Sequence, residues 1–386
     1  MSGHWSDWSH AGAEAPWTVG IEEEVMLLEP RDWSLTSRSE EVLAGLPEDM
    51  IERTMAETHG SALELATEPH ADIPSATAQL RELRSGLANV LEQIGMRAAV
   101  AGTHPFTRWE DVEVSPGARY QFLYSSMREL ARREPTFGLH VHVAVPNPEM
   151  AVRSYNRMRG HLPMLLALAG NSPFWQGRDT GLCSMRTPLF QAFPRVGIPR
   201  QFRSYADYVE GIDVLLRCDA FPEPTFLWWD VRLQPRFGTL EVRVMDAQTR
   251  VADTAAIAAL VQCLVRLEAL EGHAGHGLVT RPEVLEENRF IAARDGMAAE
   301  LIDPSLERRR PAREWLEELL VACAPHAADL GCVEELESVR ELAAATGAVR
   351  QRSRAGRGTE PQLGRVMRAL HADFTTARAK PSLLAL

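Results

Sequence analysis

The sequence predicts an α+β protein with an antiparallel or mixed sheet. Its expected strands lie mostly in the first two-thirds of the 386 residues, and the last third is dominated by Ala, Leu, Glu and Arg in helical patterns. Strands and helices do not alternate in the regular βαβ manner that a doubly wound parallel sheet requires. The chain is therefore expected to build its sheet early and to become mostly helical from about residue 252.

The domain organisation follows from the same pattern. We expect one catalytic domain over residues 17–378, preceded by a flexible tail over residues 1–16 and followed by a short tail over residues 379–386. The first residues lack a basic stretch followed by an apolar one, so they do not resemble a signal peptide.

Four segments have the alternation of apolar and polar residues that is typical of strands. These segments are 18–30, 60–67, 137–148 and 226–246, the last with two strands around a Pro-Arg-Phe-Gly turn. Apolar residues at helical spacing predict the helices, and Ser75 is a candidate N-cap for the first long one. The predicted helices cover residues 75–98, 118–133, 149–170, 204–217 and 252–270.

Three other stretches stand out, one because it has no clear period and two because they are basic. Residues 171–203 are rich in Gly, Pro, Asn and Arg, which predicts a long irregular segment of the kind that often carries function. The basic runs 307–313 and 353–357 are interpreted as solvated helix faces.

The composition limits the functions that are possible. A hydrophobic fraction of 45% suffices for a sizeable core, and a net charge of −12 disfavours nucleic acid and anionic membranes as partners. The longest apolar stretches are too short to span a bilayer. Five cysteines without a CxxC pair argue against a disulfide framework and favour a reducing, cytoplasmic compartment. The oligomeric state, including a homo-oligomer, stays open.

Carboxylates gather on one face of the first two strands. Glu22 and Glu24 share a face, whereas Glu23 points the other way. In the second strand Glu64 is flanked by small residues that leave room for an ion, and Glu57 precedes that strand and could reach the same cavity. Carboxylates this close repel each other unless a cation lies near them. A solvated acidic face is the alternative.

The third strand pairs an apolar face with a histidine face. His140 and His142 alternate with leucine and valine, so both histidines point to the same side. Such a strand resembles the wall of a site. A His-x-His pair is also common in zinc sites, and two structural histidines would give the same pattern.

The last two strands add charged residues of both signs. Glu241 and Arg243 share one face, and the preceding strand places Trp228, Asp230 and Arg232 on one face. A cross-strand ladder of ion pairs on a solvated sheet is the alternative.

Together, these faces point to metal-assisted phosphoryl transfer. Carboxylate-rich sites with few nitrogen or sulfur ligands suit Mg²⁺ or Mn²⁺ better than zinc, and arginines among carboxylates indicate an anionic substrate. Multi-metal sites of this kind promote phosphoryl transfer. The chain has no GxxxxGK[ST] loop and no GxSxG elbow, which excludes a P-loop enzyme and disfavours an α/β-hydrolase.

Five stretches carry a resemblance to a known family. They are TVGIEEEVML, HGSALELATEPH, FGLHVHVAVP, LPMLLALAGNSPFWQGRDTGLCSMR and WWDVRLQPRFGTLEVRVMDAQT. Residues 18–250 in this way resemble the glutamate–cysteine ligase type 2 group of carboxylate–amine ligases. The sequence departs from that family at Leu182-Cys183-Ser184-Met185, where an aromatic-containing YxSYR-like stretch is expected.

The resemblance implies a fold and an activity. The fold is similar to that of glutamine synthetase and the guanidino kinases, with a curved, mainly antiparallel sheet, helices on its convex side, and ATP and Mg²⁺ or Mn²⁺ on its concave side. The implied activity is ATP-dependent amide formation through an acyl phosphate, from the γ-carboxylate of glutamate and cysteine or another amine, with release of ADP and phosphate.

The same resemblance implies roles for individual residues. The implied metal ligands are Glu22, Glu24, Glu57, Glu64 and Glu241. The implied catalytic residues are His140 and Arg243, and the implied substrate-binding residues are Arg178, Arg186, His142 and Trp175. The partners are then small amino-acid and amine substrates.

Three other functions fit the same residues. A guanidino or amino-acid kinase on the same scaffold would release a phosphorylated product, a zinc metallohydrolase would use His140 and His142, and a regulatory protein would bind ligands without turnover.

Overall fold

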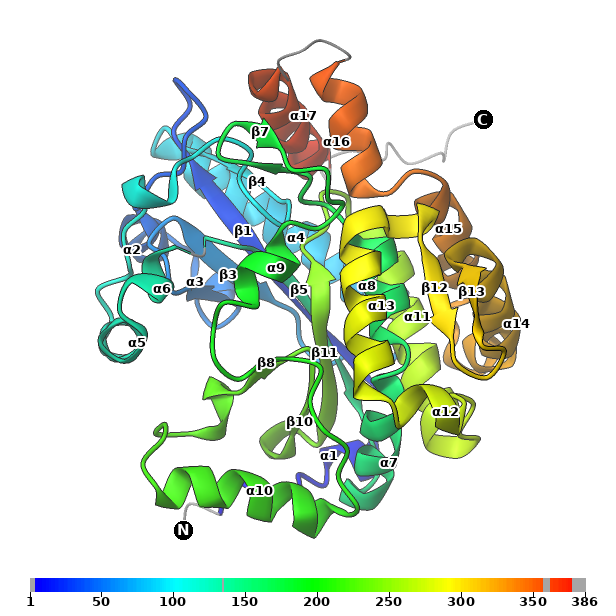
Figure 1. Cartoon of the computed structure of the whole chain (residues 1–386). Helices are drawn as coiled ribbons and strands as arrows, with labels where there is room; N and C mark the ends of the chain where they lie inside the picture. The colour runs from blue at the N-terminus through cyan, green and yellow to red at the C-terminus, as the bar shows by residue number, and fades with distance from the viewer. Residues whose placement is uncertain (1–3, 134, 357–361, 377–386) are drawn as a thin grey trace, which may run out of the picture.

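The computed structural model describes residues 4–133, 135–356 and 362–376 (Figure 1), and in it a twisted sheet runs through the middle of the molecule. Among these residues the sheet has seven strands in the order β10-β11-β5-β1-β3-β2, with β4 paired to β1, and all of its pairs are antiparallel. The strands are β1 Val19–Leu28, β2 Thr54–Ala56, β3 Ala62–Ala66, β4 Arg97–Ala99, β5 Gly138–Ala144, β10 Val231–Gln234 and β11 Thr239–Asp246. The predicted α+β class with a mainly antiparallel sheet is confirmed.

One face of the sheet is covered by a layer of helices that pack on β1, β3, β5 and β11 (Figure 1). This layer consists of α4 Ile73–Gln93, α7 Pro148–Met158, α8 Leu162–Ala169 and α11 Val251–Leu270. The apolar side chains that alternate along the strands, such as Ile21, Val25 and Val141, are buried beneath these helices. The predicted apolar face of each strand therefore forms the core, and the charged face points away from it.

The last third adds further helices, some of which pack on α8 and α11. These helices are α12 His276–Val279, α13 Pro282–Asp295, α14 Ala312–Leu330, α15 Val333–Ala344, α16 Gly347–Ala355 and α17 Leu363–Thr375. The helical interpretation of residues 307–313 is wrong in part, because β12 Glu300–Asp303 and β13 Arg308–Pro311 form a hairpin in which Arg310 pairs with Asp303 at 3.2 Å. None of the helices in the described ranges is long and apolar enough to cross a bilayer.

Two predicted helices are interrupted, and one cap differs. Residues 118–133 form α5 Ala118–Met127 and α6 Glu129–Arg132, which are separated by Arg128 with a φ of 58°. Likewise α7 and α8 divide residues 149–170. The cap of α4 is Asp72 rather than Ser75, since the Asp72 carboxylate accepts a hydrogen bond from the Ser75 amide at 2.7 Å.

The N-terminal segment is not the flexible tail that the sequence predicts. Residues 4–16 pack against the end of the sheet and include α1 Ala11–Glu14 (Figure 1). A Cβ at Gly12 would lie only 2.5 Å from the Val145 carbonyl oxygen, so the chain approaches β5 where no side chain fits. Composition predicted a flexible tail because it contains no information about the long-range contacts that hold this segment against the sheet. Residues 1–3 and the predicted tail 379–386 lie outside the described residues.

The remaining elements border the open face of the sheet or lie at its edges. They are α2 Ser39–Ala44, α3 Glu48–Ile51, β6 Phe174–Trp175, β7 Arg178–Asp179, α9 Arg186–Phe190, β8 Val196–Gly197, α10 Tyr205–Arg217 and β9 Trp228–Trp229. The Ser204 hydroxyl caps α10 by accepting a hydrogen bond from the Asp207 amide at 3.2 Å. Residues 171–203 thus contain only short elements, as their composition predicts.

Candidate active site

A cavity of about 720 Å³ lies on the charged face of the sheet, opposite α4 and α11. Its floor is formed by side chains of β1, β3, β5, β10 and β11. Its walls come from α5, α9, residues 223–228, the turn after β10 and the N-terminal segment. The predicted charged faces of four strands therefore meet in one cavity.

The strand register places the predicted ligands beside one another. Glu22 lies opposite His140, Glu24 opposite Glu64, and Glu241 opposite His142. Side chains that are directly opposite on one face of an antiparallel pair are close neighbours. Period-two alternation within each strand and this register between strands together build the site.

The predicted ligands and the two histidines form three groups in which nitrogen or oxygen atoms lie within 4.8 Å of one another. The groups are Glu24, Glu57 and Glu64; Glu22, Glu64 and His140; and Glu22, His142 and Glu241. Glu64 belongs to the first and second groups, and Glu22 to the second and third. The groups therefore form a continuous row across the sheet, from the β3 side to β11.

Carboxylates at the two ends of the row have pKa values that are shifted in opposite directions. Burial, reinforced by Glu24, raises the pKa of Glu57 to about 8, and burial together with Glu22 raises the pKa of Glu64 well above its usual value. At the other end burial also opposes ionisation, but Arg232 and Arg243 outweigh it and hold the pKa of Glu241 well below its usual value. The β3 end thus gathers three carboxyl groups, the ionisation of Glu57 and Glu64 is disfavoured there, and a divalent cation would restore their ionised form.

Glu22 links the two histidines. Its carboxylate lies 3.1 Å from His140 Nδ1 and 3.1 Å from His142 Nε2. Burial alone would raise the pKa of Glu22, but the charge of His142 and the contact with His140 lower it strongly. Within the described residues, His140 Nε2 lacks a hydrogen-bond partner and lies 3.8 Å from Glu24, whereas His142 Nε2 contacts the Glu22 carboxylate.

The zinc-pair interpretation of the two histidines is not favoured. None of the groups found among the described residues contains both His140 and His142, and each group includes at least two carboxylates. Oxygen-rich groups suit hard cations such as Mg²⁺ or Mn²⁺.

Three arginines border the row. Arg243 forms an ion pair with Glu241 and lies 3.3 Å from His140 Nδ1, while Arg232 Nε lies 2.5 Å from Glu241. Arg186 projects from α9 onto Gly138, where a Cβ would lie 2.5 Å from its Nη2 atom. Within the part of the chain that the structure describes, the Arg186 side chain donates hydrogen bonds only to backbone carbonyls, at 3.4 Å, and lies 5.5 Å from the Phe190 ring centre, so its guanidinium is available to an anionic ligand.

A network around Asp246 positions Arg186. The Asp246 carboxylate, buried at the end of β11, accepts hydrogen bonds from the Asn171 amide at 2.8 Å and the Ser172 hydroxyl at 2.6 Å. It also accepts one from the Ser184 hydroxyl at 2.8 Å, and the Arg186 amide donates to the Ser172 hydroxyl at 3.1 Å. The irregular segment 171–203 is therefore hydrogen-bonded to β11 on both sides of the β6–β7 hairpin.

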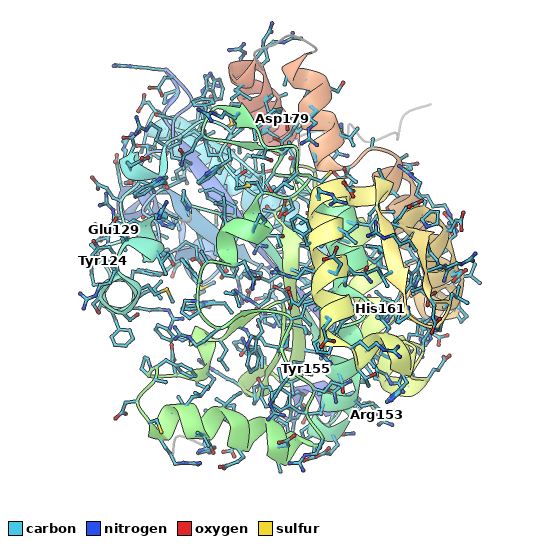
Figure 2. The ribbon with its side chains drawn as sticks, in the orientation of Figure 1. Tyr124, Glu129, Arg153, Tyr155, His161 and Asp179 are labelled. Atoms are coloured by element: carbon cyan, nitrogen blue, oxygen red, sulfur yellow. The ribbon has the colours of Figure 1, made fainter. Side chains whose placement is uncertain are left out.

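Two predicted substrate-binding residues lie elsewhere. Trp175 and Arg178 pair with each other in the β6–β7 hairpin, and neither lines the cavity. An ion pair between Asp179 and Arg352 at 2.7 Å holds the hairpin against α16, and Figure 2 shows Asp179 at that end of the molecule, far from α10. The structure therefore does not bring Trp175 and Arg178 into the cavity with the other predicted site residues.

The structure also adds residues that the sequence analysis did not assign to the site. They are Trp5, Arg119, Tyr120, Gln234 and Phe237. Gln234 follows Arg232 at period two, so strand alternation could have identified it. Asp230, expected on the same face, instead forms a buried ion pair with Arg289 at 2.5 Å, because the strand is interrupted between β9 and β10.

Comparison with protein families matches residues 18–370 to glutamate–cysteine ligase family 2 (GCS2). The chain belongs to glutamate–cysteine ligase family 2. The resemblance drawn from the five stretches is thereby confirmed. Membership in glutamate–cysteine ligase family 2 supports an ATP-dependent carboxylate–amine ligase that acts on small molecules, with a divalent metal as is typical of the family.

Relatives that carry the name glutamate–cysteine ligase 2 match most of the chain. Two come from Rubrobacter xylanophilus, with 40% identity over 87% of this chain and 89% of the relative, and 42% identity over 89% and 93%. A third, from Sorangium cellulosum, is 38% identical over 85% of this chain and 88% of the relative.

Two solved structures share the fold at low sequence identity. A glutamate–cysteine ligase from Francisella tularensis, solved in complex with AMP, has a TM-score of 0.65 and 13% identity over 93% of this chain and 89% of that protein. A bifunctional glutathione synthetase from Pasteurella multocida has a TM-score of 0.69 and 15% identity over 94% of this chain. The chain spans only about half, 52%, of that longer synthetase.

Proposed function

We propose that this protein joins the γ-carboxylate of glutamate to an amine, cysteine or another, at the expense of ATP. The observation that carries the proposal is the row of three carboxylate-rich groups on one sheet face, flanked by Arg186, Arg232 and Arg243. A polyanionic nucleotide and an anionic acid need such a combination of cation sites and guanidinium groups.

The residues present fit Mg²⁺ or Mn²⁺. The donors are carboxylate oxygens with one imidazole nitrogen in two of the groups, and the like charges at the β3 end are only partly balanced by protein cations. Glu22, Glu24, Glu57, Glu64 and Glu241 would hold the ions, with His140 and His142 at their sides. When bound, such ions neutralise phosphate oxygens and orient the nucleotide.

The chain's own residues then serve an acyl-phosphate reaction. Arg186 holds the acid, and an oxygen of its carboxylate attacks the terminal phosphorus of ATP while the bond to the ADP oxygen breaks. Arg243 stabilises the charge on the transferred phosphoryl group. The amine nitrogen next attacks the acyl carbon, the bond to phosphate breaks, and the nitrogen loses a proton. Binding in one cavity holds both partners close to each other.

The products test this route. We expect glutamate, ATP and a reactive amine to give ADP, inorganic phosphate and amide in equal amounts, because the acyl-phosphate route cleaves the outer phosphate. Coupled assays for ADP, AMP, phosphate and pyrophosphate, with mass spectrometry of the amide, measure each product. Stoichiometric AMP and pyrophosphate would exclude the mechanism. Accumulation of a phosphorylated acid that no amine consumes would instead indicate the kinase alternative.

The two histidines are expected to give different kinetic losses. His140 shares its group with Glu64 and contacts Arg243, whereas His142 shares its group with Glu241 on the β10 side. We expect His140→Ala mainly to lower kcat and to change the magnesium dependence, and His142→Ala mainly to raise a substrate KM, because losing a contact made only in the transition state lowers kcat. Steady-state kinetics across a magnesium series measure both effects. Equal losses that do not depend on magnesium would show that the pair acts as one structural unit.

A further inference from the structure

The N-terminal segment closes one end of the cavity. Trp5 lines the cavity, and its indole Nε1 donates a hydrogen bond to Asp213 of α10 at 2.7 Å. The family match begins only at residue 18, so this wall comes from a part of the chain that the family model does not cover. The site therefore includes residues beyond the family's shared sequence.

Several contacts hold this wall in place without any ligand. The Tyr205 hydroxyl donates to the Ser6 carbonyl at 2.6 Å, and the Ser9 amide donates to the Pro235 carbonyl at 2.8 Å. Trp8 Nε1 donates to the Val145 carbonyl at 3.3 Å. These bonds tie the segment to α10, to the turn after β10 and to the end of β5. The Trp5 indole is thus pre-positioned.

The wall lies at the far end of the row of ligand groups. Trp5 packs on Tyr208, with 6.4 Å between the rings, and the Tyr208 hydroxyl donates to the Leu233 carbonyl of β10 at 3.2 Å. Strand β10 lies two strands beyond β5, which is about 10 Å at the usual strand spacing. The third group, with Glu22 of β1, His142 of β5 and Glu241 of β11, is therefore the one nearest to this end.

An exposed aromatic ring lies at the same end. The Phe237 ring, in the turn after β10, is 51% exposed, lines the cavity and lies 6.2 Å from the His142 ring. The Arg236 guanidinium lies 5.7 Å from the Phe237 ring centre. A large apolar ring left open beside a charged site can stack on a ligand.

We propose that this end of the cavity binds the adenine base of ATP, with Trp5 and Phe237 as its aromatic walls. A nucleotide has a planar, uncharged end and a polyanionic end. At this end the cavity has the same order of groups, with the rings of Trp5 and Phe237 first, then Arg232 and Gln234, and then the carboxylate groups that would hold cations. The proposal rests on the proposed use of ATP and adds residues that recognise the base. The acid then occupies the opposite side, near Arg186.

Binding of two probes tests the assignment. Isothermal titration with Mg²⁺ compares ADP, which has the base, with tripolyphosphate, which lacks it. We expect Trp5→Ala to weaken ADP binding about tenfold, the scale of one base–aromatic stack, and to leave tripolyphosphate binding unchanged. Trp5→Phe should retain most of the affinity, and Phe237→Ala, a change at a half-exposed ring, should weaken ADP selectively as well. In turnover, Trp5→Ala should raise the KM for ATP and leave the KM for glutamate unchanged.

A matched control separates recognition from folding. Trp109→Ala removes an indole that packs on Arg133, outside the cavity and outside the N-terminal segment, so it should retain the ADP affinity of the wild type. Equal weakening of ADP and tripolyphosphate by Trp5→Ala, or a raised KM for the amine instead of ATP, would overturn the base assignment. So would unchanged ADP binding in both Trp5→Ala and Phe237→Ala. Wild-type protein that binds no ADP would contradict the proposed function itself.

Discussion

Glu22→Gln is expected to lower kcat by about 100-fold or more and to leave the fold intact. Glu22 is the residue that two ligand groups share, and its carboxylate contacts both His140 and His142 at 3.1 Å. An amide keeps the shape but loses the charge that binds a divalent cation. A loss of about 3 kcal/mol of transition-state stabilisation corresponds to about 100-fold in rate. Kinetics at limiting and saturating magnesium, with circular dichroism as a check of folding, measure the change.

A second substitution in the row sharpens this test. Glu241→Gln is expected to act in the same direction, because Glu241 belongs to the group that also contains Glu22. Near-wild-type turnover of either variant at limiting magnesium would show that the metal assignment is wrong. The adjacent Glu23 offers the contrast, since its side chain points to the core face and pairs with Arg84.

Arg84→Met is expected to destabilise the protein by about 3–5 kcal/mol, because it leaves the Glu23 carboxylate buried without a cation. Both side chains of this ion pair are fully buried, and Arg84 Nε donates to Glu23 at 2.7 Å. The same guanidinium donates to the Thr249 and Gln248 carbonyls at 2.8 and 2.7 Å, so it joins β1, α4 and the start of α11. Urea unfolding followed by fluorescence measures the loss.

The control for this prediction is an exposed ion pair. Arg38 pairs with Glu41 at 2.6 Å on the surface of α2, and Arg38→Met should cost less than about 1 kcal/mol. Equal destabilisation by the two substitutions would contradict the role of the buried pair. Folded Arg84→Met protein should keep the nucleotide affinity of the wild type at low temperature. This result would separate the core face of β1 from its catalytic face.

The strands of the site could be predicted because their rule is local. Alternation at period two placed Glu22 and Glu24 on one face of their strand and His140 and His142 on one face of theirs, whereas the strand order and register that bring these faces together come from the structure. The family resemblance added the specific fold and the expected roles of individual residues. The position of Glu57, just before β3, agrees with its expected role because it joins Glu24 and Glu64 in one group.

Irregular segments could not be predicted in the same way. Nothing in the period of residues 171–203 distinguishes Arg186, which enters the cavity, from Arg178, which the β6–β7 hairpin turns away. The decisive contacts are those of Asp246 with the segment, more than 60 residues along the chain. Trp5 was missed for a similar reason, since its position depends on α10, about 200 residues distant. Local composition contains no information about such partners.

The floor of the cavity is formed by strands of the sheet, whereas its walls are formed by helices and irregular segments. The charged floor belongs mainly to β1, β3, β5 and β11, whose main chains are hydrogen-bonded to their neighbours in the sheet. A shift of one residue in the register of a strand would therefore turn its charged side chains toward the core. The walls come from α5, α9, residues 223–228 and the N-terminal segment, where insertions and substitutions leave the sheet pairing intact. If relatives accept different amines, we therefore expect the responsible substitutions to lie in these walls. The residues of the floor, which we propose for the phosphate chemistry, are expected to stay the same. Exchanging wall segments between relatives is the corresponding route to new amide products.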